Sequence, residues 1–353
     1  MTDVLNKLAA NYRFDVPKDW GRINTIDMHT GGEPLRVVVS GFPELIGQTV
    51  LEKRRFLKDN HDGLRTAIMF EPRGHADMYG CVLTPPERPG SDFGIIFMHN
   101  EGYSTMCGHA TIAITKLAVE MGWVEAVEPI TEIGIDAPCG LIKAFAEVDS
   151  GKVPSCKFHN VPSFVTGIDR EIELLGIGKI TYDIAYGGAF YAYLDVDQLG
   201  LGLTPENYQQ LIHYGKLLKQ LITEQDANLI KHPFEDDLSF LYGIIFIGKS
   251  GSSENHSRNV CVFADGEVDR SPTGSGVSGR MAIHYKKGEV KVGETLTIES
   301  ILGTTFTGKV VEEVDYGDHR AVIPEVSGTA HITGQNELFI DPSDPLSAGF
   351  LLR

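Results

Sequence analysis

The chain has 353 residues, and 31 Lys and Arg against 48 Asp and Glu give it a formal net charge of −17. Because phosphate contacts need clustered basic side chains, this composition argues against a nucleic-acid partner. The hydrophobic content of 42% is that of a globular protein, and no apolar run approaches the ~20 residues of a membrane helix. With no signal-peptide pattern at the N-terminus, we expect a cytoplasmic protein that has no membrane contact and is long enough for two domains.

The elements expected along the chain are mostly strands. Residues 1–20 are polar and are expected to form an N-terminal extension. Alternation predicts a strand at 23–28 and a second at 35–39, and a charged helical segment follows at 49–58. A longer helix is predicted at 205–229. Further strands are predicted at 67–70, 94–98, 130–135, 141–148, 179–184, 189–194, 238–247, 259–264, 295–301, 304–312 and 320–326. Many strands with few helices indicate an α+β fold and not a regular βαβ alternation.

Two further helices stand out because they match each other. One is predicted from Cys107 to Gly122 and the other from Thr273 to Gly288, and both span the same distance (122 − 107 and 288 − 273). Each follows an irregular polar stretch and stops at a glycine suited to a left-handed cap. We interpret this as a weak internal repeat of two domains, each with a central helix, although the pattern alone also allows coincidence.

Two phosphate-binding patterns are present and are rejected. The segment 243–250 matches GxxxxGK[ST], but its variable positions are large and apolar, which is typical of a strand. The segment 274–279 matches GxGxxG and opens a helix. However, residues 269–272 separate it from the strand that ends near residue 264, so it does not directly follow a strand. Its free helix amides can still bind an anion. We therefore expect no nucleotide cofactor.

Cys107 is the strongest candidate for chemistry. It begins a helix beside Gly108 and two residues before His109, and helix amides favour a thiolate, so we expect a lowered thiol pKa. The alternative is that Cys107 is an ordinary buried thiol. The four remaining cysteines have no such context and are interpreted as structural: Cys81, Cys139, Cys156 and Cys261. An odd count without a CxxC pair argues against disulfides and against a zinc site, and no metal is expected.

Several segments in the same order resemble the proline racemase family. Two are its signature segments, 106–110 (MCGHA) and 269–276 (DRSPTGSG). Three more are similar to family landmarks: 27–34 (DMHTGGEP), 71–75 (EPRGH) and 182–188 (YDIAYGG). The resemblance runs from about residue 23 to the C-terminus. It implies a diaminopimelate epimerase-like fold, with two pseudo-twofold-related halves, each a barrel-like sheet around a central helix.

The resemblance also implies the domain limits and the activity. Residues 21–184 with 335–353 would form the half that carries Cys107, and residues 185–334 the half that carries Thr273, with the active site between them. Family racemases use two cysteines on opposite faces of the substrate Cα, but this chain has Thr273 at the second position. That departure resembles the family's dehydratases of trans-3-hydroxy-L-proline. The expected activity is therefore a cofactor-independent dehydration to Δ1-pyrroline-2-carboxylate and water.

Roles for the site residues follow from this resemblance. Cys107 would remove the Cα proton, and Thr273 is a candidate to bond the leaving hydroxyl or a water. The amides near Gly108 and His109 would bind the substrate carboxylate, as would those of Gly274 and Ser275, and Asp269 would hold the ring ammonium with help from His109. Asp269 could instead cap its helix, and His109 could be a packed histidine. His29, Glu33, Arg73 and His75 are given no role.

Two other functions stay open from the sequence. One is a proline or hydroxyproline epimerase, and the other is a non-catalytic imino-acid binding protein that has lost its second base. A homodimer is implied by the resemblance, with a small imino acid as the expected ligand.

Overall fold

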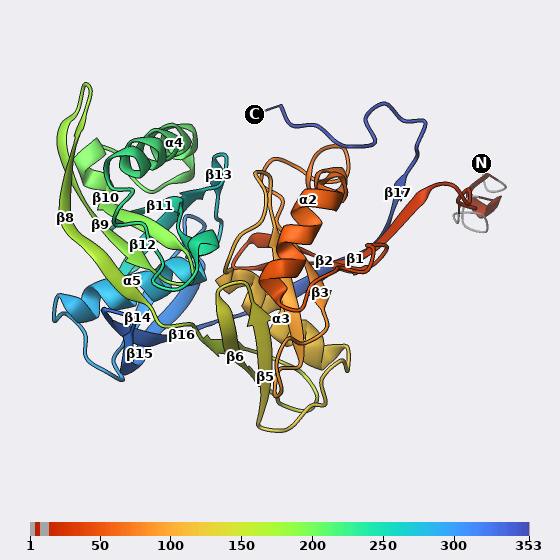
Figure 1. Ribbon diagram of the computed structural model, residues 1–353, viewed down its shortest axis with the longest axis horizontal. Coiled ribbons are helices and arrows are strands. Elements are labelled where there is room, and N and C mark those ends of the chain that lie inside the picture. The colour runs from red at the N-terminus through yellow and green to blue at the C-terminus, as the bar shows by residue number, and fades with distance from the viewer. Residues whose placement is uncertain (1–3, 8–13, 353) are drawn as a thin grey trace.

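The structure of the protein is a computed structural model that describes residues 4–7 and 14–352. Its elements form two lobes side by side, each built around one central helix (Figure 1). Among the described residues, seventeen strands are joined by hydrogen bonds into one continuous sheet that runs through both lobes. The predicted α+β fold class is confirmed. Residues 1–3 and 8–13 of the predicted extension lie outside the described residues.

The first lobe contains the two ends of the described chain and the helix that starts after Cys107. Its elements are β1 (Gly21–Thr30), β2 (Glu33–Ser40), α2 (Val50–Met69), β3 (Gly80–Thr84), β4 (Phe93–Met98), α3 (Gly108–Glu120), β5 (Ile130–Ala137), β6 (Gly140–Glu147), β7 (Cys156–His159) and β17 (Ala330–Ile340). Strand β1 pairs antiparallel with both β2 and β17, so the C-terminal strand returns to the first lobe.

The second lobe contains the helix that starts after Thr273. Its strands are β8 (Phe164–Leu174), β9 (Gly178–Tyr186), β10 (Phe190–Asp195), β11 (Leu241–Gly248), β12 (Ser257–Phe263), β13 (Glu267–Val268), β14 (Thr295–Glu299), β15 (Thr305–Tyr316) and β16 (His319–Gly328). Its helices are α4 (Tyr208–Gln225), α5 (Gly274–Lys286) and the short 3₁₀ turns η1 (Val196–Leu199), η2 (Pro205–Asn207) and η3 (Asp236–Leu238). Strand β7 pairs with both β6 and β16 and so joins the sheets of the two lobes.

The two matched helices are confirmed, and each is wrapped by sheet. Helix α3 contacts β1, β2, β6, β7, β16 and β17, and every residue from Gly108 to Val119 except Lys116 is buried. Helix α5 contacts β8, β9, β10, β15 and β16 and is buried along its first ten residues. The predicted terminal glycines have φ values of +68° at Gly122 and +76° at Gly288, the left-handed conformation that glycine adopts without a steric cost. An apolar helix surface on all sides is therefore explained by burial on all sides.

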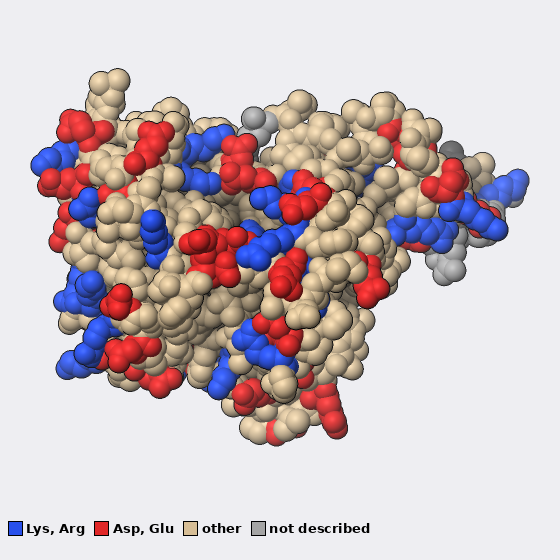
Figure 2. All heavy atoms as spheres, viewed as in Figure 1, with Lys and Arg blue, Asp and Glu red and all other residues tan. Residues whose placement is uncertain are grey.

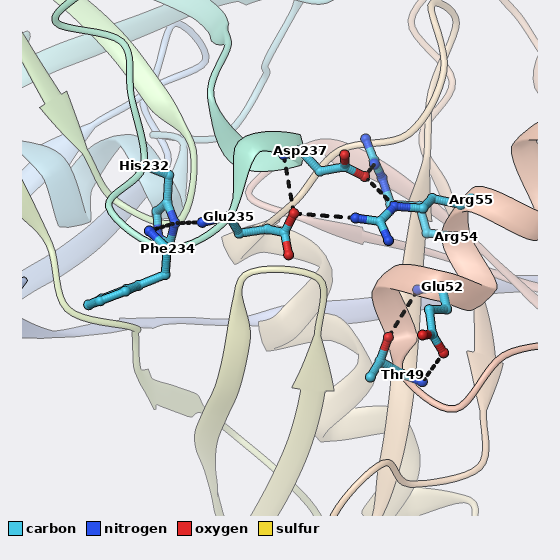
Figure 3. A network of polar contacts seen from close by, with 8 residues as sticks. All are labelled: Thr49, Glu52, Arg54, Arg55, His232, Phe234, Glu235 and Asp237. Carbon is cyan, nitrogen blue, oxygen red and sulfur yellow. Dashed lines mark hydrogen bonds and ion pairs between the residues drawn. The ribbon is translucent and has the colours of Figure 1, made fainter.

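The predicted strand at 67–70 is wrong, because these residues end a longer helix. Helix α2 begins with a capping box, in which Thr49 and Glu52 each accept a hydrogen bond from the other's backbone amide (Figure 3). It passes through a kink at His61, where φ is −138°, and continues to Met69. Ile68 and Met69 are fully buried with the β4 strand and its neighbours. An apolar run this short cannot distinguish a buried strand from a buried helical turn.

Other differences concern boundaries and missed strands. Helix α4 begins at Tyr208 after a 3₁₀ turn, and β11 begins at Leu241. The strands not predicted are β3, β7, β8, β13 and β17. Strand β17 illustrates the reason, since only its first residue is buried and its alternation is weak. It is a strand because β1 supplies a hydrogen-bonding partner along its whole length.

The domain limits remain a prediction, and the strand pairing suggests a refinement. The expected boundary at 184/185 falls inside β9, which pairs with β8 on one side and β10 on the other. Both β8 and β9 contact α5. We therefore propose that the boundary lies between β7 and β8, and that the second lobe begins near residue 160.

Polar contacts bridge the lobes next to α2. The Arg55 guanidinium is paired with Asp237 at 2.7 Å and with Glu235 at 3.3 Å, both from the segment around η3 (Figure 3). Exposed ion pairs of this kind contribute at most about 1 kcal/mol. Two buried contacts lie deeper. The amide of Asn100 donates to Glu267 at 2.6 Å, and the amide of Arg270 donates to Glu33 at 2.7 Å. These buried bonds fix how the two lobes face each other.

The charged residues are dispersed over the surface. On the face shown in Figure 2, acidic and basic side chains are interspersed, and no continuous basic patch is seen there. Within the described ranges, no helix combines the length and the apolar character needed to cross a membrane.

Candidate active site between the two matched helices

The first turns of α3 and α5 touch each other. A Cβ atom added to Gly108 would lie 2.5 Å from the Cα of Gly274, and a Cβ added to Gly274 would lie 2.7 Å from the Cα of Gly108. Distances this short are not tolerated between backbones, so both positions need glycine. The close approach brings the residues that precede these glycines, Cys107 and Thr273, to the same small space between the lobes.

Cys107 is the N-cap residue of α3 and is 4% exposed. Its Sγ accepts a hydrogen bond from the amide of Ala110 at 3.4 Å, as the helix start predicts. The predicted direction of its pKa is nevertheless wrong. Burial raises the pKa of the Cys107 thiol well above its usual range, and the Ala110 amide and the nearby Tyr79 hydroxyl oppose this only in part. In this structure, desolvation of the thiolate raises the pKa of Cys107 more than the helix N-terminus lowers it.

His109 contacts the Cys107 thiol directly. Its Nδ1 lies 3.1 Å from the Cys107 Sγ, and its Nε2 lies 3.2 Å from the carbonyl oxygen of Pro34. Because a carbonyl can only accept, Nε2 carries the ring proton and Nδ1 is left to accept from the S–H group. Burial lowers the pKa of His109 to about 3, so the ring is neutral. His109 therefore orients the thiol and is not an ordinary packed histidine.

Asp269 lies on the α5 side of the space and is 4% exposed. Its Oδ1 accepts from the amide of Ser271 at 2.7 Å, so it orders the turn before α5 and does not cap the helix. Burial raises the pKa of Asp269 to about 6, against opposing contributions from Ser271, Thr273 and Arg270. A buried carboxylate with a raised pKa gains most from a cationic partner such as a ring ammonium.

Thr273 has an unusual backbone. Its φ is +66°, a left-handed value that is rare for a β-branched residue and is often found at functional sites. The hydroxyl is buried and makes no hydrogen bond of normal geometry with any described residue, although it lies near enough to Asp269 to lower that pKa. Thr273 therefore lines the same small space as Cys107, with a hydroxyl that has no hydrogen bond of normal geometry to a described residue.

The helix starts supply donors for an anion. The first amides of a helix have no partner within it, and here these are the amides of Gly108 and His109 in α3 and of Gly274 and Ser275 in α5. The structure thus brings together every site residue named from the sequence. Whether these residues carry out the chemistry remains a prediction.

The aromatic walls of the space were missed by sequence reasoning. Together with the residues above and Met106, it is lined by the aromatic residues Tyr79, Tyr191, Tyr242 and Phe263. They come from separate strands and loops of both lobes, and an isolated aromatic residue in a strand has no local signal for a site. The cavity has a volume of about 10 Å³, room for about one water molecule. A five-membered ring does not fit into this space as it stands.

Two landmark residues left without a role prove to be structural. Glu33 is fully buried and accepts the Arg270 amide, which ties the turn after β1 to the segment before α5. Burial raises the pKa of Glu33 well above its ordinary value, and the charge of Asp269 adds to this. Arg73 donates to the carbonyls of Ala67 and Ser347 and so holds the C-terminal segment against α2.

Comparison with known proteins agrees with this arrangement. A family model described as proline racemase matches residues 25–351. The chain belongs to the proline racemase family. A trans-3-hydroxy-L-proline dehydratase of Colwellia psychrerythraea is 54% identical over 94% of this chain and 93% of its own. A 3-hydroxyproline 2-epimerase of Burkholderia multivorans is 46% identical over 94% and 98%.

A solved hydroxyproline epimerase shares the whole fold. The crystal structure of a hydroxyproline epimerase from Agrobacterium vitis, with bound trans-4-OH-L-proline, is 31% identical and superposes with a TM-score of 0.89 over 95% of this chain and 96% of its own. The expected diaminopimelate epimerase-like architecture is thereby confirmed.

Proposed function

We propose that this member of the proline racemase family dehydrates trans-3-hydroxy-L-proline to Δ1-pyrroline-2-carboxylate and water. The observation that carries the proposal is one thiol, Cys107, facing a threonine, Thr273, across touching helix starts. Relatives of nearly the same length bear the name of this activity. A threonine hydroxyl is too weak an acid to serve as a second base, so chemistry that needs only one base is favoured.

The substrate carboxylate would accept from the amides at the two helix starts, where negative charge builds as the Cα proton leaves. Asp269 would pair with the ring ammonium. Bringing that cation into the cavity, beside Cys107, also favours the thiolate and so offsets the desolvation that raises the thiol pKa in the free protein. Hydroxide then leaves C3, and the resulting enamine gains a proton at C3 and loses one from the ring nitrogen, which gives the cyclic imine.

The geometry of the substrate explains why one thiol suffices. In the trans isomer the hydroxyl and the carboxylate lie on opposite faces of the ring, so the Cα hydrogen and the hydroxyl share a face. Cys107 removes that hydrogen and afterwards holds its proton on the side where hydroxide departs. The same thiol can therefore return the proton to the leaving oxygen, and water is released.

Epimerisation is the competing function, since one relative bears that name. It requires a proton donor on the face opposite Cys107, and the residue that we assign to that face is Thr273, whose hydroxyl is a poor acid. We therefore place epimerisation second.

Incubating the purified protein with trans-3-hydroxy-L-proline and treating the product with o-aminobenzaldehyde tests the proposal. The cyclic imine is expected to accumulate, and the same assay with L-proline is the control because it lacks a leaving group. Accumulation of the Cα epimer without any imine would show that the chain is an epimerase.

The raised pKa of Asp269 predicts a break in the pH profile. Below about pH 6 Asp269 takes up a proton and loses its attraction for the ring ammonium. We expect kcat/KM to fall by an additional factor of about ten for each pH unit below this break, beyond any loss that comes from thiol protonation. Initial rates at pH 4.5–8, with return of samples to pH 8 to verify reversibility, would measure it. A smooth profile through pH 6 would mean that Asp269 does not pair with the substrate.

A further inference from the structure

Tyr242 reaches from the second lobe to the Cys107 side of the cavity. It lies on β11, is 5% exposed, and lines the catalytic cavity. Its ring lies 5.6 Å from that of His99, which in turn lies 5.9 Å from the ring of Tyr79. The Tyr79 ring packs edge-on against His109 at 4.8 Å, and His109 contacts the thiol. Tyr242 is thus linked through aromatic contacts to the Cys107 half of the site, and its ring also packs edge-on against that of Tyr191 at 5.7 Å.

The hydroxyl of Tyr242 is buried without a hydrogen bond of normal geometry to any described residue. The neighbouring Tyr79 hydroxyl donates to the Ser104 hydroxyl at 2.7 Å, because Ser104 donates onward to the carbonyl of Met106. The Tyr79 oxygen can still accept, and its interaction with Tyr242 contributes to the raised pKa of Tyr242. Burial raises the pKa of Tyr242 well above its ordinary value, so the group is a neutral O–H donor. Leaving such a donor without an acceptor costs about 1–3 kcal/mol. A ligand oxygen that accepts its hydrogen bond would remove this cost.

Tyr191, the third tyrosine of the cavity, differs because its hydroxyl has a hydrogen-bond partner. The Tyr191 hydroxyl is bonded to the Ser275 hydroxyl at 2.7 Å, on the α5 side. Thr273 also lies on that side, across the cavity from Cys107.

We propose that the Tyr242 hydroxyl binds the 3-hydroxyl of the substrate and stabilises that oxygen as it leaves. This inference rests on the proposed function, because the 3-hydroxyl of the trans isomer lies on the same face as the hydrogen that Cys107 removes. A bond from Tyr242 spreads the negative charge that develops when the C3–O bond breaks, and the thiol supplies the proton that completes water. In the cis isomer the hydroxyl lies on the opposite face, away from Tyr242.

Replacing Tyr242 with Phe tests this role, because the ring and its contacts are kept and no existing bond is lost. We expect kcat for dehydration to fall roughly 10- to 100-fold, the effect of losing one hydrogen bond to a developing charge. In deuterium oxide we also expect more Cα deuterium in the recovered substrate for each molecule of imine formed. When hydroxide leaves more slowly, the deprotonated intermediate returns to substrate more often.

Tyr186→Phe is the matched control. Tyr186 is also in the second lobe, is fully buried and has a hydroxyl without a hydrogen-bond partner, but it does not line the cavity. Its variant is expected to keep both the wild-type rate and the wild-type exchange ratio. If Tyr242→Phe lowers exchange and dehydration together, or changes neither, the leaving-group role is overturned. Failure of the wild-type protein to form imine would instead refute the proposed function.

Discussion

Replacing Cys107 with Ser is expected to lower kcat for imine formation by about 10³-fold or more, because positioned proton transfer typically contributes 10²- to 10⁴-fold. The serine hydroxyl has nearly the size of the thiol and can accept the Ala110 amide bond, so the start of α3 should be kept. It cannot provide an anionic base near neutral pH. The measurement is the initial rate of imine formation at saturating substrate.

Cys156→Ser provides the control for this loss. Cys156 is another buried thiol of the first lobe, lies on β7 and does not line the cavity. Its variant should retain activity within a few-fold of the wild type, with any effect confined to the melting temperature. Full activity of Cys107→Ser would contradict a catalytic thiol and would favour a protein that binds imino acids without turning them over.

Replacing Thr273 with Cys is expected to produce epimerase activity. The new thiol would stand opposite Cys107, so that one thiol removes the Cα proton and the other adds a proton from the opposite face. We expect inversion of trans-3-hydroxy-L-proline at Cα to rise at least about 10²-fold above the wild-type level, the lower range for a positioned acid or base. Chromatography on a chiral column would detect the product, and solvent deuterium should enter at Cα with inversion.

Thr273→Ser separates the thiol from the change in side-chain size. It keeps a hydroxyl and removes only the methyl group, which also makes the left-handed backbone at φ +66° easier to adopt. Dehydration without epimerisation is expected from this variant. If Thr273→Cys folds and dehydrates but never inverts Cα, then position 273 does not face the substrate as proposed.

Features that depend on neighbouring residues in the chain were predictable. The starts and ends of α3 and α5 follow from glycines and polar residues at fixed positions, and both helices were placed to within two residues. The failure at 67–70 has the same origin, because the local pattern could not show that these residues end a helix that continues past the kink at His61. Strand β17 likewise depends on a partner about 300 residues away.

The electrostatics of the site could not be predicted in the same way. The pKa of Cys107 depends on how completely the second lobe excludes water, and burial outweighs the local helix amides that the sequence revealed. The surroundings of the Tyr242 hydroxyl depend even more on tertiary structure. Only the contact between the two lobes places this hydroxyl beside the cavity without a hydrogen bond of normal geometry.

By itself, the amino-acid sequence singled out the residues that we propose for the reaction: one thiol at Cys107, a threonine at position 273, and two helix starts with free amides. These are matters of residue identity and short-range capping, which a linear pattern records. Only the tertiary structure decided that Gly108 and Gly274 touch, that aromatic residues from both lobes close the cavity, and that the thiol is protonated before substrate arrives. Contact and desolvation depend on distances between remote segments, and these exist only after the chain has folded.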